Sequence, residues 1–216
     1  MKFFLISFFV SCFFNHKAFS LDTIAKQAIL YDYETKTIIF EKNSEELMSP
    51  SSMSKIMTIY YVFKKIKDGD LKLTDKFKVS KKAWKKGGSK MFVNVNTMVS
   101  VEDLIRGIIV QSGNDACIAI AEGISGSETL FAEELNLLAK EIGMMNSSFT
   151  NSTGWPDPDH LTTIKDLLTL TVRTIEDFPE LYYYYAEKEF TYSGIRQLNR
   201  NPLLFNEINA DGLKTG

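Results

Sequence analysis

A serine and a lysine three residues apart are the first side chains in this sequence that suggest chemistry. The segment Ser52-Met53-Ser54-Lys55 places a hydroxyl and an amine on one face of an expected helix. The apolar residues that follow would bury the amine, which lowers its pKa and makes a neutral lysine available as a base. A serine can then act as a nucleophile without a histidine. Alone the pattern is weak, because this composition produces S-x-x-K about once or twice by chance.

A second group, Ser112-Gly113-Asn114, interrupts an expected helix. A hydroxyl at such a break can relay a proton, and a carboxamide can hold a substrate amide. The alternative is structural: the end of one helix followed by an N-cap at Asn114.

The third group is Lys214-Thr215-Gly216 at the end of an expected strand. A lysine there can bind a substrate carboxylate, and the threonine can donate a hydrogen bond to it. The glycine would let a substrate backbone approach closely. Alone this tripeptide is an ordinary turn. The order S-x-x-K, S-x-N, K-T-G is nevertheless the order found in penicillin-binding proteins and class A β-lactamases.

The elements that must position these groups begin with a β-hairpin, in which Ala28–Tyr33 and Thr37–Phe40 flank a polar turn. A helix follows, with Ser49 as N-cap, Pro50 at the first helical position and Gly69 as the stop. Its apolar residues cover nearly the whole circumference, so we expect this helix to be buried.

Further helices and strands complete the expected fold. A capping box of Ser100 and Asp103 predicts a helix through about Val110. Three more helices are expected, from Asp115 to near Gly123, over Ser127–Ile142 and over Thr163–Ile175. A loop is expected over 147–160, and strands are expected over 188–192 and 211–216. Strands at both ends with helices between them predict an α/β (α+β) sandwich: an antiparallel sheet flanked by helices, with a helical subdomain.

Other chemistries find little support. The chain has two histidines, and the first lies within residues 1–20, which are interpreted below as a signal peptide, so a metal site is not expected. The remaining His160 lies in a Pro/Asp-rich loop and is interpreted as a structural hydrogen-bonding residue, not as the base of a Ser-His-Asp triad. No phosphate-binding glycine loop is present, because "KKGGSK" lacks the spacing and the flanking elements. The sequence therefore predicts no cofactor and no metal.

The N-terminus predicts export. Lys2 is followed by an apolar run too short to span a bilayer, and then by Ala18-Phe19-Ser20, so residues 1–20 are interpreted as a signal peptide. A membrane anchor is the alternative, and a lipoprotein through Cys12 is a weaker one. The mature chain then begins near Leu21.

Composition sets further limits. With 216 residues, 44% apolar and 24% charged, the chain is that of a globular protein with one sizeable core. Loss of the leader removes two lysines, which changes the formal net charge from −2 to −4 and leaves Cys117 without a disulfide partner. The charge argues against a nucleic-acid partner. The basic run over 78–90 is interpreted as a solvated face, with contact to an anionic envelope surface as the alternative.

Longer stretches show a resemblance to a known family. The sequence resembles the D-alanyl-D-alanine carboxypeptidases, which are low-molecular-mass penicillin-binding proteins of the serine peptidase type. The likeness lies in "SPSSMSKIMT", "GGSKMFV", "VEDLIRGIIVQSGNDACIAIAE", "MNSSFTNSTGW" and "NRNPLLFNEINADGLKTG". It covers essentially residues 21–216, which we therefore expect to form one penicillin-binding catalytic domain with a β-lactamase/transpeptidase-like fold.

The resemblance implies a role for each motif. Ser52 would attack the carbonyl of a terminal D-Ala-D-Ala bond and form an acyl-ester, and Lys55 would accept its proton. Ser112 would relay a proton to the leaving D-alanine, and Asn114 would hold the peptide. Water would then release the shortened peptide.

The K-T-G motif would complete the substrate site. Lys214 and Thr215 would bind the terminal carboxylate or its β-lactam mimic, next to Gly216. The oxyanion hole is expected to use the N–H of Ser52 and one from just beyond Gly216.

The implied activity is removal of the terminal D-alanine from peptidoglycan pentapeptides, in the bacterial periplasm or cell envelope. The implied partners are the stem peptide ending in D-Ala-D-Ala and β-lactam antibiotics. In the family the K-T-G strand continues into further strands, a helix and often a membrane anchor. We therefore expect that the sequence is C-terminally truncated, that peripheral membrane association would need the missing anchor, and that the activity of this chain is in doubt.

Two rival functions remain open. A β-lactamase shares the nucleophile, but "NSTGWPDPDH" offers no glutamate for rapid deacylation, and the middle motif is Ser-Gly-Asn instead of Ser-Asp-Asn. A catalytically inactive peptidoglycan-binding fragment is the other, although the motif side chains at positions 52, 55, 112 and 114 argue against it for the parent protein.

Overall fold

A buried helix organises the fold of the chain, whose computed structural model describes residues 21–206 and 208–216. The predicted signal peptide lies outside the described residues. A 3-10 turn, η1 (Ser51–Ser54), leads directly into helix α1 (Lys55–Lys67), and Gly69 ends the helix with a left-handed backbone (φ +82°). All nine residues from Lys55 to Phe63 are buried, which confirms the prediction of a buried helix.

The predicted start of this helix is wrong. The first turn begins at Ser51, Pro50 occupies the N-cap position, and no side chain caps the helix. The reason lies in Ser51, whose left-handed backbone (φ +49°) breaks the regular helical path between Pro50 and the rest of the turn.

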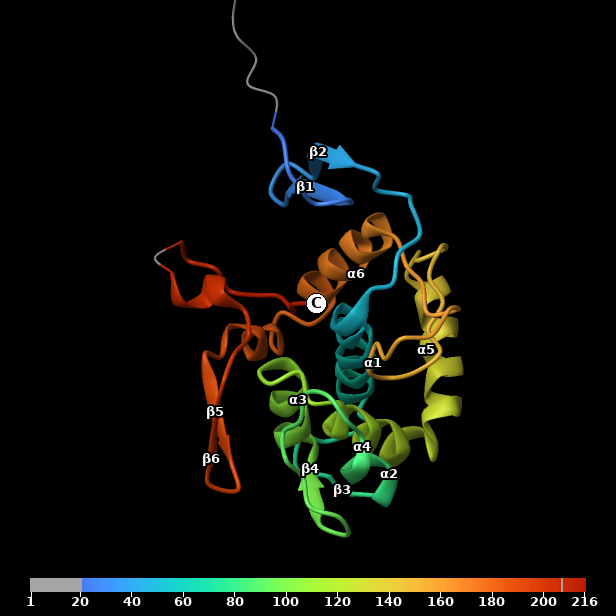
Figure 1. Cartoon of the computed structure of the whole chain (residues 1–216), viewed down its shortest axis with the longest axis vertical. Helices are drawn as coiled ribbons and strands as arrows, with labels where there is room; N and C mark the ends of the chain where they lie inside the picture. Colours follow the sequence, from blue (N-terminus) through green and yellow to red (C-terminus); the bar gives the residue numbers. More distant parts are fainter. Residues whose placement is uncertain (1–20, 207) are drawn as a thin grey trace, which may run out of the picture.

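Helices α3 (Val101–Ile109), α5 (Glu128–Glu141) and α6 (Ile164–Asp177) pack against α1, and α4 (Asn114–Ser125) packs against α3 and α5 (Figure 1). Three begin where they were predicted to begin: Ser100, the predicted cap, and Ser127 and Thr163, the first residues of two predicted helical segments, each accept a backbone N–H from the first turn. Helix α4 continues past Gly123 to Ser125, with Gly126 as its C-cap. Gly123 is instead a close-packing position, where a Cβ would lie 2.1 Å from the Phe77 ring.

The strands form three separate antiparallel pairs in the described part of the chain. The predicted hairpin is confirmed as β1 (Ala28–Asp32) with β2 (Thr37–Lys42). The other pairs are β3 (Lys76–Lys78) with β4 (Met98–Ser100), and β5 (Glu189–Tyr192) with β6 (Ile195–Leu198). Of these only β5 was predicted, since the three residues of β3 and of β4 are too few to show an alternating pattern.

The strand predicted over 211–216 is wrong. This segment pairs with no strand of the described chain, and its Gly212 carbonyl accepts a hydrogen bond from the Asn201 side chain (2.7 Å). A strand requires a neighbouring ladder to satisfy its backbone groups, and here a side chain takes that place.

The predicted loop over 147–160 is confirmed and is tied to its surroundings by bridges between Met48 and Thr162 and between Ser148 and Leu161. The remaining short elements are α2 (Lys81–Lys85), η2 (Tyr182–Ala186) and η3 (Pro202–Phe205). The α2 lysines are exposed, in agreement with a solvated basic face. Among the described residues no helix is long and apolar enough to cross a membrane.

Candidate active site

Ser52 and Lys55 meet at the start of α1. The Lys55 Nζ lies 3.1 Å from the Ser52 Oγ, as expected for side chains three residues apart at a helix start. Lys55 is only 1% exposed, and this burial lowers the pKa of its amine, with a further lowering from the charges of Arg200 and Lys86. The sequence therefore correctly predicted both the pairing and the burial of this lysine.

A backbone carbonyl provides the second contact of the lysine. The Lys55 Nζ donates a hydrogen bond to the Thr153 carbonyl at 2.5 Å. With one N–H directed at Thr153, the lone pair of a neutral amine is free to accept the proton of Ser52. Thr153 was not foreseen, because a backbone acceptor leaves no mark in a sequence.

The loop that carries Thr153 lies tightly on the start of α1. The Thr58 hydroxyl donates to the Ser152 carbonyl at 2.8 Å. Gly154 has φ +75°, and a Cβ at this position would lie 1.8 Å from the Ser51 carbonyl oxygen. Only a glycine fits this approach, so Gly154 fixes how close the loop comes to the S-x-x-K motif.

His160 forms hydrogen bonds to Thr150 in this loop and to Ser54, and not to Ser52. Its Nδ1 accepts the backbone N–H of Thr150 (3.1 Å), so the ring proton lies on Nε2, which donates to the Ser54 Oγ (2.7 Å). The ring is 1% exposed, and burial lowers the pKa of His160. The interpretation of His160 as a hydrogen-bonding structural residue is confirmed.

The S-x-N motif lies in the break between α3 and α4. Ser112 has a left-handed backbone (φ +62°), and its Oγ is buried with no hydrogen-bond partner in the described part of the chain. Gly113 is the N-cap of α4, so the alternative of an N-cap at Asn114 is wrong. Asn114 instead donates from Nδ2 to the Gly87 carbonyl (2.9 Å).

The segment that follows Gly87 in the chain is also anchored to α4. The buried Asp115 carboxylate accepts the backbone N–H groups of Met91 (2.9 Å), Phe92 (3.0 Å) and Val93 (3.2 Å). Three backbone donors on one carboxylate hold the 91–93 segment against the start of α4. This anchor could not be predicted, because Asp115 lies more than twenty residues from its partners in the sequence.

Lys214 is the second buried lysine of the site. It is 9% exposed, and its Nζ donates to the Thr215 carbonyl at 2.8 Å. Burial, followed by the charge of Lys55, lowers the pKa of Lys214 to about 7. Such an amine gains a proton readily when an anion binds beside it.

Two of the three motifs are in direct contact. A Cβ on Gly216 would lie 3.1 Å from the Met53 Cγ, so K-T-G is packed against S-x-x-K. The third motif is linked through Gly88, where a Cβ would lie 2.7 Å from the Asn114 Nδ2 and 3.3 Å from the Trp155 ring. Trp155 directly follows Gly154, so the loops at 87–88 and 151–155 connect S-x-N with the start of α1.

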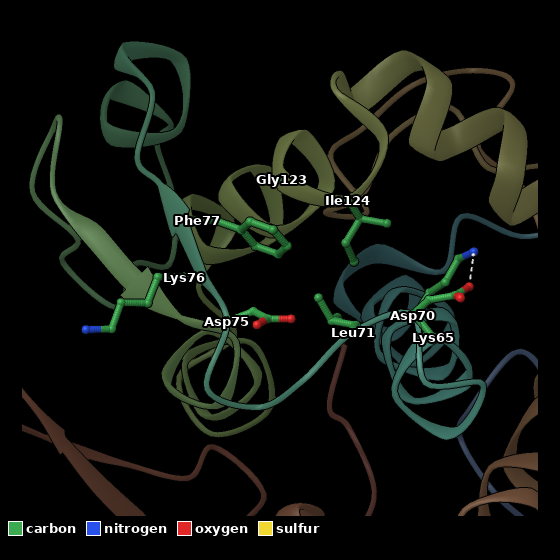
Figure 2. Close-up of a pocket in the computed structure, with 8 residues that line it drawn as sticks. All are labelled: Lys65, Asp70, Leu71, Asp75, Lys76, Phe77, Gly123 and Ile124. Carbon is green, nitrogen blue, oxygen red and sulfur yellow. Dashed lines mark hydrogen bonds and ion pairs between the residues drawn. The ribbon is translucent and has the colours of Figure 1, made fainter.

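A cavity of about 430 Å³ lies elsewhere, between the C-terminal end of α1, β3 and the end of α4 (Figure 2). Its apolar wall is formed by Leu71, Phe77 and Ile124, and Asp70 in it is paired with Lys65. The helical rise places Lys65 about 15 Å along α1 from Lys55. None of the predicted site residues lines this cavity. The described residues contain no cluster of three or more potential metal ligands.

The comparisons with known proteins agree with this arrangement. A family model described as D-alanyl-D-alanine carboxypeptidase, peptidase S11, matches residues 15–216. The chain belongs to this carboxypeptidase family. It is 42% identical over 199 residues to D-alanyl-D-alanine carboxypeptidase DacC of Escherichia coli (strain K12), covering 89% of this chain and 50% of that protein. The chain thus spans about half the length of the curated carboxypeptidases it matches.

Solved structures confirm the predicted fold class. Penicillin-binding protein 5 from Haemophilus influenzae is similar with a TM-score of 0.88 and 40% identity, over 91% of this chain and 58% of that one. Penicillin-binding protein D2 from Listeria monocytogenes, in its ampicillin-bound form, is similar with a TM-score of 0.80 and 26% identity, over 91% and 80% of the two chains. This carboxypeptidase-family chain therefore has the penicillin-binding fold over the part that it spans.

Proposed function

We propose that this chain carries the catalytic machinery of a serine-type D-Ala-D-Ala carboxypeptidase, which removes the terminal D-alanine from peptidoglycan pentapeptides. The observation that carries this proposal is the buried Lys55 amine, 3.1 Å from the Ser52 hydroxyl and with a lowered pKa. Family membership and the K-T-G segment packed on the same motif support it.

In the proposed acylation, the Ser52 Oγ forms a bond to the carbonyl carbon of the D-Ala-D-Ala linkage, and its proton passes to the lone pair of Lys55. The bond from that carbon to the terminal D-alanine nitrogen then breaks. The Ser112 hydroxyl relays the proton from Lys55 to the leaving nitrogen, which departs as free D-alanine. The Ser112 hydroxyl is buried and has no hydrogen-bond partner among the described residues, so it is available for this relay.

The substrate is held on both sides of the scissile bond. Asn114 binds a peptide amide, and Lys214 and Thr215 bind the terminal carboxylate next to Gly216. The partly neutral Lys214 suits this role, because an entering carboxylate favours its protonated form. Water then hydrolyses the acyl-ester, which releases the shortened peptide and restores Ser52.

The proposed partners and location follow from the same chemistry. A β-lactam resembles the D-Ala-D-Ala terminus and would acylate Ser52 as well. Pentapeptide substrates lie outside the cytoplasmic membrane, so the proposed location is the bacterial periplasm or cell envelope, as the predicted leader over 1–20 also indicates.

The test is D-alanine release from a pentapeptide ending in D-Ala-D-Ala, together with labelling by a fluorescent penicillin. Ser52→Ala is expected to abolish both. Ser51→Ala is the matched control, because the exposed neighbouring serine makes no contact with Lys55 among the hydrogen bonds of the described chain. Equal D-alanine release from Ser52→Ala and wild type would refute the serine mechanism.

The same assays separate the rival functions. A penicilloyl-enzyme lasting minutes or longer supports the carboxypeptidase, and one lasting milliseconds supports a β-lactamase. Binding of peptidoglycan without D-alanine release from the wild type supports a non-catalytic binding protein.

A further inference from the structure

Glu128 contacts the loop whose Thr153 carbonyl accepts a hydrogen bond from Lys55. It opens α5 and is 9% exposed. Its Oε1 accepts two hydrogen bonds from Ser152, from Oγ at 2.8 Å and from the backbone N–H at 3.3 Å. Its Oε2 pairs with the Lys82 ammonium at 2.7 Å. Both oxygens of this carboxylate are therefore engaged.

The opposite side of the same loop faces α1. The consecutive carbonyls of Ser152 and Thr153 accept hydrogen bonds from Thr58 and Lys55. Thr58 and Lys55 are three residues apart, so they present their donors on one face of the helix. Residues 152–153 are thus fixed between two donors on α1 and one carboxylate on α5.

We propose that Glu128 is a positioning residue for the general base, which acts by clamping Ser152 so that the Thr153 carbonyl orients the Lys55 amine toward Ser52. This inference rests on the proposed function for its catalytic consequence. The clamp itself consists of the hydrogen bonds from Ser152 to Glu128 and from Lys55 to the Thr153 carbonyl, so it can be tested without the catalytic reaction.

Orientation matters because a neutral amine has a single lone pair. The Thr153 carbonyl takes one N–H at 2.5 Å and thereby fixes where that lone pair points. Misplacement of a reacting group by about 1 Å can cost roughly 100-fold in rate. Since Glu128 does not bond Lys55 or Ser52, its loss is expected to reduce the rate of acylation and to leave substrate binding nearly unchanged.

The experiment compares Glu128→Ala with Glu128→Gln in the purified protein. The first readout is the rate constant of acylation by a fluorescent penicillin, with kcat and KM for the D-Ala-D-Ala peptide. The alanine variant is expected to lower the acylation rate about 10- to 100-fold with KM within about threefold. The glutamine variant keeps an oxygen that can accept from Ser152, so it is expected to restore the rate to within about threefold of the wild type.

The second readout does not depend on turnover. It is the labelling rate of Lys55 with an amine-reactive reagent, located by mass spectrometry. In Glu128→Ala the loosened loop is expected to expose Lys55 and raise its labelling several-fold. Lys82→Met is the matched control: it removes the ion pair and leaves the Ser152 contacts, so labelling and acylation are expected to stay within about threefold of the wild type.

Several outcomes would overturn the inference. One is wild-type acylation and wild-type Lys55 labelling in Glu128→Ala; another is a glutamine variant as slow as the alanine variant. If the alanine variant does not fold, Ser152→Ala tests the inference in its place. This variant removes the 2.8 Å hydrogen bond from the Ser152 hydroxyl and keeps the one from the backbone N–H. Labelling of Lys55 at the wild-type rate in Ser152→Ala refutes the clamp. If the wild type neither binds penicillin nor releases D-alanine, the proposed function fails, and Lys55 labelling alone decides the inference.

Discussion

Lys214 and Lys55 occupy one buried site, where the charge of Lys55 adds to the effect of burial and brings the pKa of Lys214 to about 7. Burial also lowers the pKa of Lys55. The two lysines are suited to opposite protonation states in the proposed reaction, since Lys55 must be neutral to accept a proton and Lys214 must be charged to bind a carboxylate.

This pair makes kcat/KM for a carboxylate substrate depend on pH. Lys214 is cationic below its pKa and neutral above it, so kcat/KM is expected to fall as the pH rises above about 7. Lys214→Arg keeps the charge throughout this range and is expected to remove the falling limb, whatever its effect on the maximal rate. The measurement is kcat/KM for D-alanine release between about pH 5 and about pH 10. An unchanged falling limb in the arginine variant would exclude Lys214 as its source.

Gly154→Ala tests the close approach of the loop to α1. A Cβ at position 154 would lie 1.8 Å from the Ser51 carbonyl oxygen, so the loop must move and carry the Thr153 carbonyl away from Lys55. We expect a loss of about 100-fold in penicillin acylation. Gly194→Ala is the control: it has a similar backbone (φ +77°) with nothing within 4 Å, and is expected to cost about 1 kcal/mol of stability without slowing acylation. Equal acylation by the two variants would contradict this role of Gly154.

Stability is expected to fall in weak acid because of His160. Burial lowers its pKa in the folded protein below the ordinary value near 6.5, so below about pH 6.5 the unfolded chain binds a proton that the folded chain does not. The stability that the neutral ring provides is complete above that pH and is lost as the pH falls toward the folded-state pKa. The slope is at most about 1.4 kcal/mol per pH unit. Urea unfolding near pH 7.5 and near pH 5.5 measures it, and His160→Gln should reduce the difference. The same difference in wild type and variant would rule out His160 as its cause.

Asp115→Ala tests the anchor of the 91–93 segment. The variant leaves the backbone N–H groups of Met91, Phe92 and Val93 without their carboxylate, and we expect a loss of about 2 to 4 kcal/mol in the free energy of unfolding. Hydrogen exchange at residues 91–93 should become faster. Asp159→Ala, at an exposed position in the 147–160 loop, is expected to stay within about 0.5 kcal/mol of the wild type. Unchanged exchange in Asp115→Ala would show that the segment is held by other contacts.

Most features that depend on residues close in sequence were predicted correctly, apart from the N-caps expected at Ser49 and Asn114. The cap at Ser100 bonds a backbone group three residues away, and Ser52 meets Lys55 across a single turn. For such features the number of residues between the two partners sets their geometry, so a sequence pattern is enough to predict the contact.

Features that depend on distant partners were not predicted. The Thr153 carbonyl contacts Lys55 from a distant loop, and the Glu128 carboxylate on α5 bonds Ser152 of that loop. Nothing near Lys55 in the sequence marks either group. The strand expected at 211–216 failed for the related reason that strand formation depends on a neighbour, and the Asn201 side chain takes the place of one.

The contact between Met53 and Gly216 joins residues that are synthesised at different times during translation. A ribosome synthesises the chain from the N-terminus, so Ser52 and Lys55 emerge early, whereas Lys214, Thr215 and Gly216 emerge after every other described segment. Domains tend to fold as units during synthesis, and contacts between distant parts of a chain form late. A nascent chain thus lacks the contact between the two motifs until residues 214–216 have emerged, and under the proposed function acylation of Ser52 by a β-lactam is expected only after the K-T-G segment has docked.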